Sequence, residues 1–460
     1  MNDIKNTQHE TNEESKFGLG GAILYGVNVV LGTGILLLPR TIFQDLGPAS
    51  LLAMALCTGL VFLLALCFAE VSGYFTKNGG AYQYARATFG GLTAFNVGIL
   101  SWFTVTAVWS ASASGLSELL AITFPSLRGF EALIGAAVII ALMFMNLTGI
   151  KTVKIFTITV TISKMIPMFA VGIIGLFFLK NGIDAGNYSP FLQLSPDMSV
   201  SKAFASTAMT VFYAFVGFES LPIIAGEIRN PKKNVPMAIL ISLILVSVLY
   251  VLIIAAAIST LGSELLTSDA PIQDAFAIMV GRWGYWFISV GAIVSLIGLN
   301  VGDSTHSPRM LEAVAEDGTL PAIVAYKDKK GTPVVAIIIT SLISLLLVIS
   351  GSFEALVELS VVFYFFQYIP TALSVIVLRR RKYRGEDGDV NTEEQFKVPG
   401  GFIIPVLAVA VSLWMIISDS WTHLITAAVG IAIATAVYYL FNKIITPKTD
   451  DAVAPTVDEN

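Results

Sequence analysis

Four ionisable side chains lie inside long apolar runs of this 460-residue chain: Lys164, Glu219, Asp303 and His306. An unpaired charge at the centre of a lipid bilayer costs at least about 2.5–3.5 kcal/mol, so each of these residues is a candidate for function. Ammonium, carboxyl and imidazole groups can relay protons or recognise a charged solute. They do not form a pattern for bond-breaking chemistry, because the chain has neither a His-Glu-X-X-His nor a Gly-X-Ser-X-Gly motif.

Lys164 and Glu219 each allow two interpretations. Lys164 follows Lys154 by ten residues, which is about 15 Å along a helix and therefore near mid-membrane. We expect its ammonium group to act in the mechanism; the alternative is a side chain that bends back to the interface. Glu219 follows Gly217 in an apolar segment. It is either a carboxyl group that responds to pH or a hydrogen-bond acceptor that holds a helix interruption open.

Asp303 and His306 lie three residues apart, so a helix places them on nearly the same face. An anion at membrane depth favours a cationic partner, which could belong to a bound solute. The alternative is that Asp303 pairs with His306, Lys164 or another protein group. His306 has a reference pKa near 6.5 and could join a proton relay, or it could be a satisfied hydrogen-bonding group.

The backbone carries a second signal in the stretch Asn28–Arg40, NVVLGTGILLLPR. Its two glycines and one proline are poor helix formers. Irregular backbone at membrane depth is tolerated only inside protein or beside a watery cavity. A half-helix N-terminus attracts an anion and the facing C-terminus a cation, so one break can hold a zwitterion. Gly217 predicts a matching break in a later segment, as expected for an inverted repeat.

The elements that position these groups follow from composition. Hydrophobic residues make up 55% of the chain and charged residues 13%, against about 25% charged residues in soluble domains. This predicts an all-α integral membrane protein. Two cysteines are too few for a disulfide framework or a zinc site, so we expect no metal and no cofactor, and nothing indicates nucleic-acid binding. Twelve segments are long enough to cross a bilayer: 19–44, 49–75, 91–123, 130–148, 153–179, 202–227, 236–261, 284–313, 332–350, 353–378, 401–418 and 422–441.

Lysine and arginine gather in alternate loops, most densely in Arg379–Arg384, RRRKYR. Positive charge stays on the cytoplasmic side, so both termini are predicted to be cytoplasmic. We expect a 5+5 inverted repeat in which transmembrane helices 1 and 6 are discontinuous. The predicted parts are a disordered tail at 1–17, helices 1–5 at 18–179, helices 6–10 at 202–378, helices 11–12 at 401–442 and a disordered tail at 447–460.

Several motifs together resemble the amino acid–polyamine–organocation superfamily of amino acid transporters, over nearly the whole chain. They are GTGILLLP (32–39), AEVSGYFTKNGGAYQYARATFG (69–90), NLTGIK (146–151), FYAFVGFES (212–220), EIRNPKKNVPMA (227–238) and RMLEAVAEDGTLP (309–321). The family pattern has proline where this chain has Thr76, which is a small departure. The resemblance implies a twelve-helix bundle with helices 1 and 6 unwound at its centre.

The resemblance also implies roles for individual residues. The substrate α-carboxylate would meet the N–H groups of Thr33, Gly34 and Ile35, and its amino group the carbonyls of Val30, Tyr213 and Val216. The Tyr213 ring would act as a gate. In similar proteins a lysine at the position of Lys164 reaches the first break, and a glutamate at the position of Glu219 responds to pH. Asp303 stands where arginine/agmatine antiporters carry a large aromatic residue that lines the pocket for the substrate's side chain. The resemblance therefore implies an anionic pocket that suits a cationic substrate, such as lysine, ornithine, histidine or a decarboxylated amine.

These observations favour a secondary active transporter that moves an amino acid or related amine across the plasma membrane by alternating access. Antiport and proton-coupled permeation both remain open, as does exchange specific for cationic substrates through Asp303. A membrane-embedded enzyme and a channel are less consistent with the motifs, and we expect the protein not to be an enzyme. The expected partners are the substrate, protons and the lipid bilayer, and the chain is either a monomer or a homodimer.

Overall fold

The structure is a computed structural model that describes residues 16–32, 34–194, 198–350, 362–383, 395–418 and 421–445. Within these residues the chain is helical, apart from one isolated parallel bridge between Phe17 and Ile228. The longer helices are α2 (Leu19–Val30), α3 (Gly34–Leu46), α4 (Ser50–Ser72), α5 (Ala81–Phe89), α6 (Gly91–Thr123), α7 (Glu131–Leu147), α8 (Ile150–Leu176), α10 (Val200–Phe215), α12 (Pro231–Leu261), α13 (Pro271–Val280), α14 (Arg282–Glu316), α15 (Val334–Ser350), α17 (Phe365–Arg380), α18 (Ile403–Ser418) and α19 (Trp421–Ile445).

Short helical pieces connect these elements. They are α9 (Leu179–Asp184), α11 (Ser220–Ile223) and the 3-10 turns η1 (Gly47–Ala49), η2 (Pro125–Leu127), η3 (Ala225–Glu227), η4 (Gly262–Leu266), η5 (Ala322–Ala325) and η6 (Val362–Tyr364). The membrane-length segments expected from the sequence fall on helices, with ends that differ by a few residues. The part of the expected segment 353–378 that spans 353–361 lies outside the described residues.

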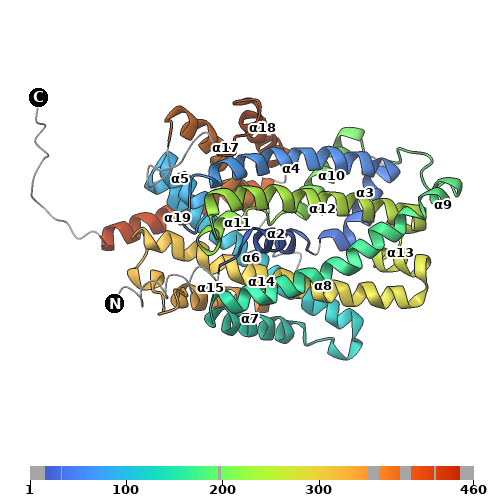
Figure 1. Ribbon diagram of the computed structural model, residues 1–460, viewed down its shortest axis with the longest axis horizontal. Coiled ribbons are helices and arrows are strands. Elements are labelled where there is room, and N and C mark those ends of the chain that lie inside the picture. Colours follow the sequence, from blue (N-terminus) through green and yellow to red (C-terminus); the bar gives the residue numbers. More distant parts are fainter. Residues whose placement is uncertain are drawn as a thin grey trace, which may run out of the picture.

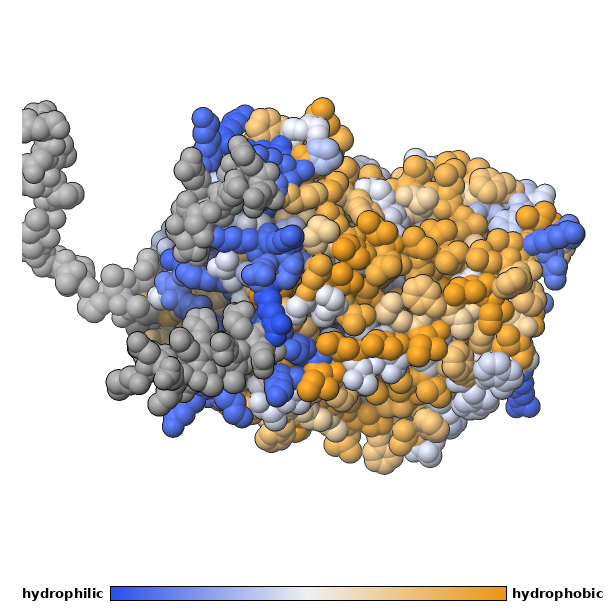
Figure 2. Space-filling view, in the orientation of Figure 1, coloured by the Kyte–Doolittle hydropathy of each residue, from blue (hydrophilic) through white to orange (hydrophobic). Residues whose placement is uncertain are grey.

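The outside of the molecule is apolar, as a lipid-embedded protein requires. Seven helical stretches of the described chain are long and apolar enough to cross a membrane, and shorter apolar helices accompany them. Figure 2 shows hydrophobic residues over the middle and right of one face and hydrophilic residues at its left end. Large apolar side chains such as Ile166, Phe177 and Leu346 are exposed on this outer surface. The chain is a multi-pass membrane protein.

The interior is built around α12 and α14. The helix α14 packs against α6 and α8, while α12 packs against α2, α4 and α8. Figure 1 shows α4 and α12 side by side along the long axis of the molecule, with α5 at the left end. At 35 residues α14 is about 52 Å long, more than the roughly 30 Å hydrocarbon core, so it extends beyond the membrane into polar surroundings.

The first apolar segment of the chain, 19–44, is interrupted at the position that its glycines predict. The helix α2 ends at Val30, and α3 begins at Gly34. Leu31 still donates to the carbonyl of Val27 at 2.9 Å, but Gly32 donates to Val30 in a tighter turn, also at 2.9 Å. A Cβ on Gly32 would meet Leu299 at 2.9 Å, so glycine lets α14 approach the break closely.

A second interruption lies against the first. The helix α10 ends at Phe215, and α11 begins at Ser220. Gly217 has φ +123°, and a Cβ there would be 2.5 Å from the Val29 carbonyl oxygen. Only glycine fits a backbone of this conformation so close to another chain segment. The two interruptions therefore touch through their backbones.

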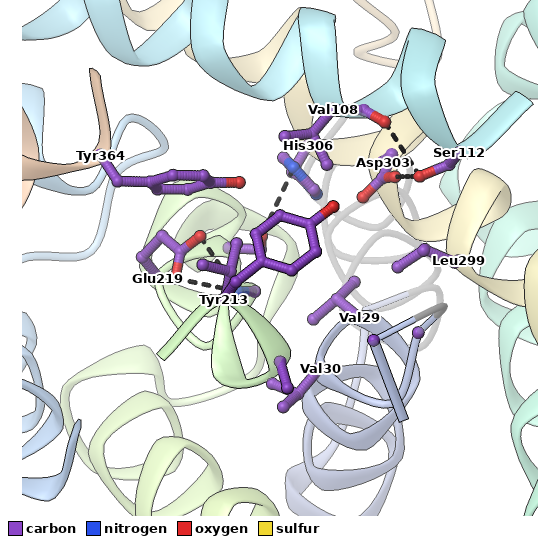
Figure 3. Close-up of a pocket in the computed structure, with 16 residues that line it drawn as sticks. Val29, Val30, Val108, Ser112, Tyr213, Glu219, Leu299, Asp303, His306 and Tyr364 are labelled. Atoms are coloured by element: carbon purple, nitrogen blue, oxygen red, sulfur yellow. Dashed lines mark hydrogen bonds between the residues drawn. The ribbon is translucent and has the colours of Figure 1, made fainter. Parts of the chain in front are cut away.

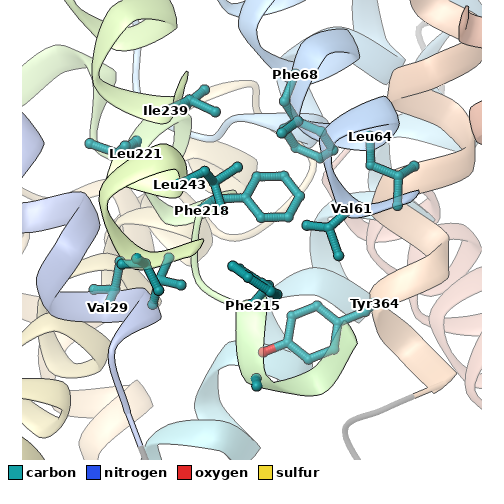
Figure 4. Close-up of a cluster of buried hydrophobic side chains, with 14 of the residues drawn as sticks. Val29, Val61, Leu64, Phe68, Phe215, Phe218, Leu221, Ile239, Leu243 and Tyr364 are labelled. Carbon is teal, nitrogen blue, oxygen red and sulfur yellow. The ribbon is translucent and has the colours of Figure 1, made fainter. Parts of the chain in front are cut away.

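Aromatic rings brace the second interruption. Phe218 stacks on Tyr368 with ring centroids 5.7 Å apart and meets the edge of Phe68 at 5.4 Å. Phe215 lies 5.2 Å from Tyr250 of α12. Figure 4 shows Phe215 and Phe218 among the apolar side chains that surround this segment. The interrupted backbone is thus fixed by packing that the flanking helices supply.

The N-terminal end of the described chain is tied to the same region. Phe17 is fully buried, its N–H donates to the Glu227 carbonyl at 2.9 Å, and its carbonyl accepts from Arg229 N–H at 2.8 Å. The boundary expected at residue 17 therefore runs through a packed residue, while residues 1–15 lie outside the described chain. Nothing in the sequence pattern marks this contact.

Candidate functional site

A pocket opens where the two interruptions meet, between α2, α3, α6, α10 and α14 (Figure 3). Its cavity volume is about 40 Å³. Three of the four ionisable groups singled out from the sequence, Glu219, Asp303 and His306, belong to its lining. Its lining residues are Val29, Val30, Gly32, Gly34, Val108, Ser112, Tyr213, Ala214, Val216, Gly217, Glu219, Ser220, Leu299, Asp303, His306 and Tyr364.

Two of the three N–H groups expected to bind a carboxylate, those of Gly34 and Ile35, lie at the start of α3. Gly34 lines the pocket at the first position of this helix, and Ile35 beside it is buried. The first N–H groups of a helix have no partner within it and carry its positive dipole end. A Cβ on Gly34 would lie 3.1 Å from Ala214, so glycine also allows α10 to approach. Thr33 lies outside the described residues.

Two of the three carbonyls expected to meet an amino group, those of Val30 and Tyr213, already accept hydrogen bonds inside the protein. The Tyr250 hydroxyl oxygen lies 3.1 Å from the Val30 carbonyl oxygen and 3.0 Å from the Ala214 carbonyl oxygen, so its one proton is shared between these two acceptors. Val216 N–H donates to the Tyr213 carbonyl at 3.2 Å. Since a carbonyl oxygen has two lone pairs, the Tyr213 carbonyl can accept one further donor, whereas the Val30 carbonyl already faces both Gly32 N–H and the Tyr250 hydroxyl. Tyr250 thus joins the two interruptions from α12.

Lys164 lies behind the pocket, not in its lining. Its Nζ donates to the carbonyls of Asn28 and Leu31, at 2.6 Å each, and its side chain is fully buried. The last carbonyls of a helix lack partners within it and carry negative partial charge. The ammonium group therefore satisfies the end of α2 and does not extend to the interface.

Glu219 caps the second interruption. Both carboxylate oxygens accept from Gly217 N–H, at 3.1 and 3.0 Å, and Tyr368 donates its hydroxyl to Oε2 at 3.3 Å. The side chain is buried and lines the pocket. The expectation of an acceptor that holds the break open matches this geometry. It leaves room for a second role in proton transfer, because the same carboxyl group borders the pocket.

Asp303 and His306 both line the pocket from α14, but they have different partners. Asp303 Oδ2 accepts from the Ser112 hydroxyl at 2.8 Å. His306 Nδ1 lies 3.3 Å from the Tyr25 hydroxyl and Nε2 lies 3.4 Å from the Ser220 hydroxyl. Figure 3 shows Asp303 beside Ser112, and the Tyr213 ring between these groups and Glu219.

Sequence reasoning missed several lining or supporting residues. Ser112 and Val108 come from α6, Tyr364 from η6, and Tyr250 from α12. Ser112 stands in the run SASAS, whose small polar residues are a weak signal for close helix packing. No sequence signal singles out Tyr250, because its role depends on how α12 crosses both interruptions. Among the described residues, no group of three or more His, Cys, Asp and Glu side chains could hold a metal ion.

Comparison with known proteins is consistent with this architecture. A family model described as amino acid permease matches residues 17–449. The chain is 28% identical over 433 residues to the mouse b(0,+)-type amino acid transporter 1, covering 90% of this chain and 85% of the relative. It is 26% identical over 444 residues to a serine/threonine exchanger of Bacillus subtilis, covering 94% and 97%. It is also 26% identical over 446 residues to a methylthioribose transporter of that organism, covering 91% and 92%.

Proposed function

Because the chain belongs to the amino acid permease family, within the amino acid–polyamine–organocation superfamily, we propose that it moves an amino acid or related amine across the plasma membrane by alternating access. The family and the relatives are transporters and not enzymes. The observation that carries the proposal is the meeting of two interrupted helices at one pocket. Gly217 of the second break packs against Val29 of the first, and both line that pocket.

In this pocket the substrate's negative charge would bind at a helix N-terminus and its positive charge at helix C-termini. Its α-carboxylate binds the N–H groups at the start of α3, from Thr33, Gly34 and Ile35. Its amino group binds the carbonyls of Val30, Tyr213 and Val216, and the Tyr250 hydroxyl then bonds to Ala214 in place of Val30. The Tyr213 ring closes over the bound molecule. These are mostly backbone interactions, which suit a substrate class defined by its α-amino and α-carboxylate groups.

The wider architecture of the proposal is a bundle of twelve membrane helices, in which helices 1–5 and 6–10 form inverted repeats. The helices α2 and α3 make up the first span, and α10 and α11 the sixth. Alternating access is then a movement of one set of helices around a fixed central site. The end of the molecule that carries α5, here called the α5 end, faces the cytoplasm, and so do both termini.

Two forms of energy coupling remain within the proposal. Exchange requires only that the empty carrier switches slowly between its two states. Proton symport requires a group that changes protonation during the cycle, and Lys164, Glu219 and His306 are the candidates. Lys164 is best placed, because the carbonyls that bind its ammonium group belong to the first interruption.

A second candidate function is exchange specific for cationic amino acids or amines. The observation that favours it is the Asp303 carboxylate in the lining of the pocket, with a neutral hydroxyl group from Ser112 as its hydrogen-bond partner. A cationic side chain of the substrate would supply the missing positive charge. The relatives' names include serine/threonine and methylthioribose, so the family relationship does not select among substrates.

Counterflow in proteoliposomes tests the proposed function. Purified protein is reconstituted into liposomes loaded with each of the twenty amino acids, ornithine or histamine, and uptake of the same radiolabelled compound is followed. The proposal predicts saturable accumulation of at least one compound, recovered chemically unchanged. Lack of accumulation with every compound, in liposomes that contain correctly folded protein, would contradict it, and recovery of an altered compound would indicate an enzyme.

A further inference from the structure

A second pocket lies toward the α5 end, where the loops after α4 and before α15 meet η3 and α14. Its cavity volume is about 380 Å³. Lys77, between α4 and α5, is part of its lining, and α5 lies at the left end of the molecule in Figure 1. The pocket is therefore near the hydrophilic end seen in Figure 2.

The two pockets are neighbours along two shared elements. On α14, His306 lines the first pocket while Arg309 and Glu312 line the second, and a rise of 1.5 Å per residue separates them by about 5–9 Å along the axis. After the second interruption, Ser220 lines the first pocket and Glu227 the second. A solute leaving the first pocket along these elements would enter the second.

Hydrogen bonds join the two shared elements at residues that line the pockets. Arg309 is buried, donates from Nε to Glu227 Oε1 at 3.0 Å and donates from Nη1 to the Thr305 carbonyl at 2.7 Å. His306 lies within 3.4 Å of the Ser220 hydroxyl. These contacts join α14 to the segment that follows the second interruption. Movement of that segment would open a passage between the pockets.

Both signs of charge line the second pocket, with cations in excess. Lys16, Lys77, Arg309, Lys327 and Lys330 face Glu227, Glu312 and Glu316. Lys327 is held by two carboxylates, Glu312 at 2.5 Å and Glu316 at 2.6 Å. Burial opposes its charge, but these carboxylates raise the pKa of Lys327 above its usual value. The pair with Lys327 uses only one of the two Glu312 oxygens.

The other oxygen of Glu312 has no donor. Its side chain is 2% exposed, and Oε2 has no hydrogen-bond partner among the described residues. A buried carboxylate oxygen is normally matched by a donor. An ammonium group in the pocket would supply that donor, and a carboxylate on the same molecule would meet the excess of lysines. A small solute with both groups, such as an amino acid, matches this charge pattern better than a simple anion.

We propose that this second pocket is a transient binding site for the transported amino acid, between the central pocket and the aqueous phase at the α5 end. The Glu312 carboxylate binds the amino group, and the lysines at the rim attract the carboxylate. This inference rests on the proposed function, because it assumes that an amino acid passes through the central pocket.

Cysteine protection can test the second site separately from the first. The native Cys57 and Cys67 are buried, so a thiol introduced by Thr76→Cys, in the lining of the second pocket, reports on that pocket. The probe is the amino acid that shows the fastest counterflow, added before a charged methanethiosulfonate reagent. We expect it to slow the reaction in which the Thr76→Cys thiolate displaces methanesulfinate from the reagent and forms a mixed disulfide. When Glu312→Gln is added to the Thr76→Cys protein, the amino acid concentration that halves the rate of cysteine modification should rise at least five-fold.

The control is Glu316→Gln, which removes the other carboxylate from Lys327 and changes the net charge equally; it should raise that concentration less than two-fold. Equal protection in all three proteins would overturn the proposal, because it would mean that occupancy of the central pocket alone causes the protection. Protection by inorganic phosphate, undiminished by Glu312→Gln, would also overturn it and indicate an anion site.

If Glu312→Gln does not fold, Glu312→Asp, which withdraws the carboxylate by one methylene, replaces it with the same expectation. Failure of every amino acid in counterflow would instead refute the proposed function.

Discussion

Lys164 of α8 donates a hydrogen bond from its ammonium group to the Leu31 carbonyl, at 2.6 Å, in the first interrupted helix. The same nitrogen binds the Asn28 carbonyl one turn earlier. A charged donor thus takes the place that a bound cation would need at the end of α2. The helix break and the lysine form one unit, so a change in either should affect the other.

Replacing Lys164 with methionine should lower both stability and transport. Hydrogen bonds to a charged group contribute about 1.5–3 kcal/mol each, and two are lost while the carbonyls stay buried. We expect a lower thermal midpoint in detergent and at least a ten-fold slower counterflow, with weaker dependence on pH. Lys180→Met, at an exposed position on α9, is the control and should behave as wild type. Unchanged uptake and pH dependence in Lys164→Met would remove this lysine from the mechanism.

Gly217→Ala should destabilise the protein by more than about 1 kcal/mol, because alanine does not fit the native conformation there. The position has φ +123°, and the new Cβ would lie 2.5 Å from the Val29 carbonyl oxygen. Gly59→Ala on α4 is a matched control, since nothing lies within 4 Å of its Cβ and alanine is the better helix former. Thermal unfolding of both variants in the same detergent measures the difference. Equal stability of the two would show that the close approach of the interruptions is not essential.

Two variants of Glu219 separate its capping role from its charge. Glu219→Ala leaves Gly217 N–H without its acceptor, and a buried unpaired donor costs about 1–3 kcal/mol, so the thermal midpoint should fall. Glu219→Gln keeps one acceptor oxygen and should remain closer to wild type in stability. If the carboxyl group also carries a proton during transport, Glu219→Gln will abolish the pH dependence of counterflow. A pH profile identical to that of wild type would limit Glu219 to capping.

Asp303→Asn tests whether the pocket selects cationic substrates. The substitution keeps the size of the side chain but removes the charge, so lysine and ornithine should compete at least ten-fold less well, with little change for neutral amino acids. Ser112→Ala removes the hydroxyl group that binds Asp303 while keeping the carboxylate, and it should preserve the preference for cations. Inhibition constants against the transported label measure the effect. If cationic compounds never inhibit uptake of the label by the wild-type protein, the Asp303 carboxylate does not select the substrate.

The sequence supports much of the fold and part of the site for identifiable reasons. Runs of apolar residues predict where helices lie, since the bilayer sets their length, and glycines locate both interruptions. The depth of Lys164 follows from simple counting along a helix. The contacts of Tyr250, Ser112 and Phe17 could not be predicted, because each depends on how one element crosses another.

The short helices are harder to predict from the sequence, for a similar reason. The helices α5, α9 and α13 lie between the long apolar segments, where hydrophobic length gives no signal. The sequence leaves the partner of Asp303 open among several groups, and the structure places Ser112 of α6 against it. Helix register between α6 and α14 decides that contact, and a sequence alone does not fix the register of packed membrane helices.

Protection of a cysteine in the central pocket tests the account most directly. Val216 lines this pocket, and its proposed role belongs to its backbone carbonyl, so Val216→Cys should still transport. We predict that the transported amino acid slows alkylation of this cysteine, with half-protection near the concentration that half-saturates counterflow. Active transport by Val216→Cys with no protection at saturating amino acid would contradict a binding site between the two interrupted helices.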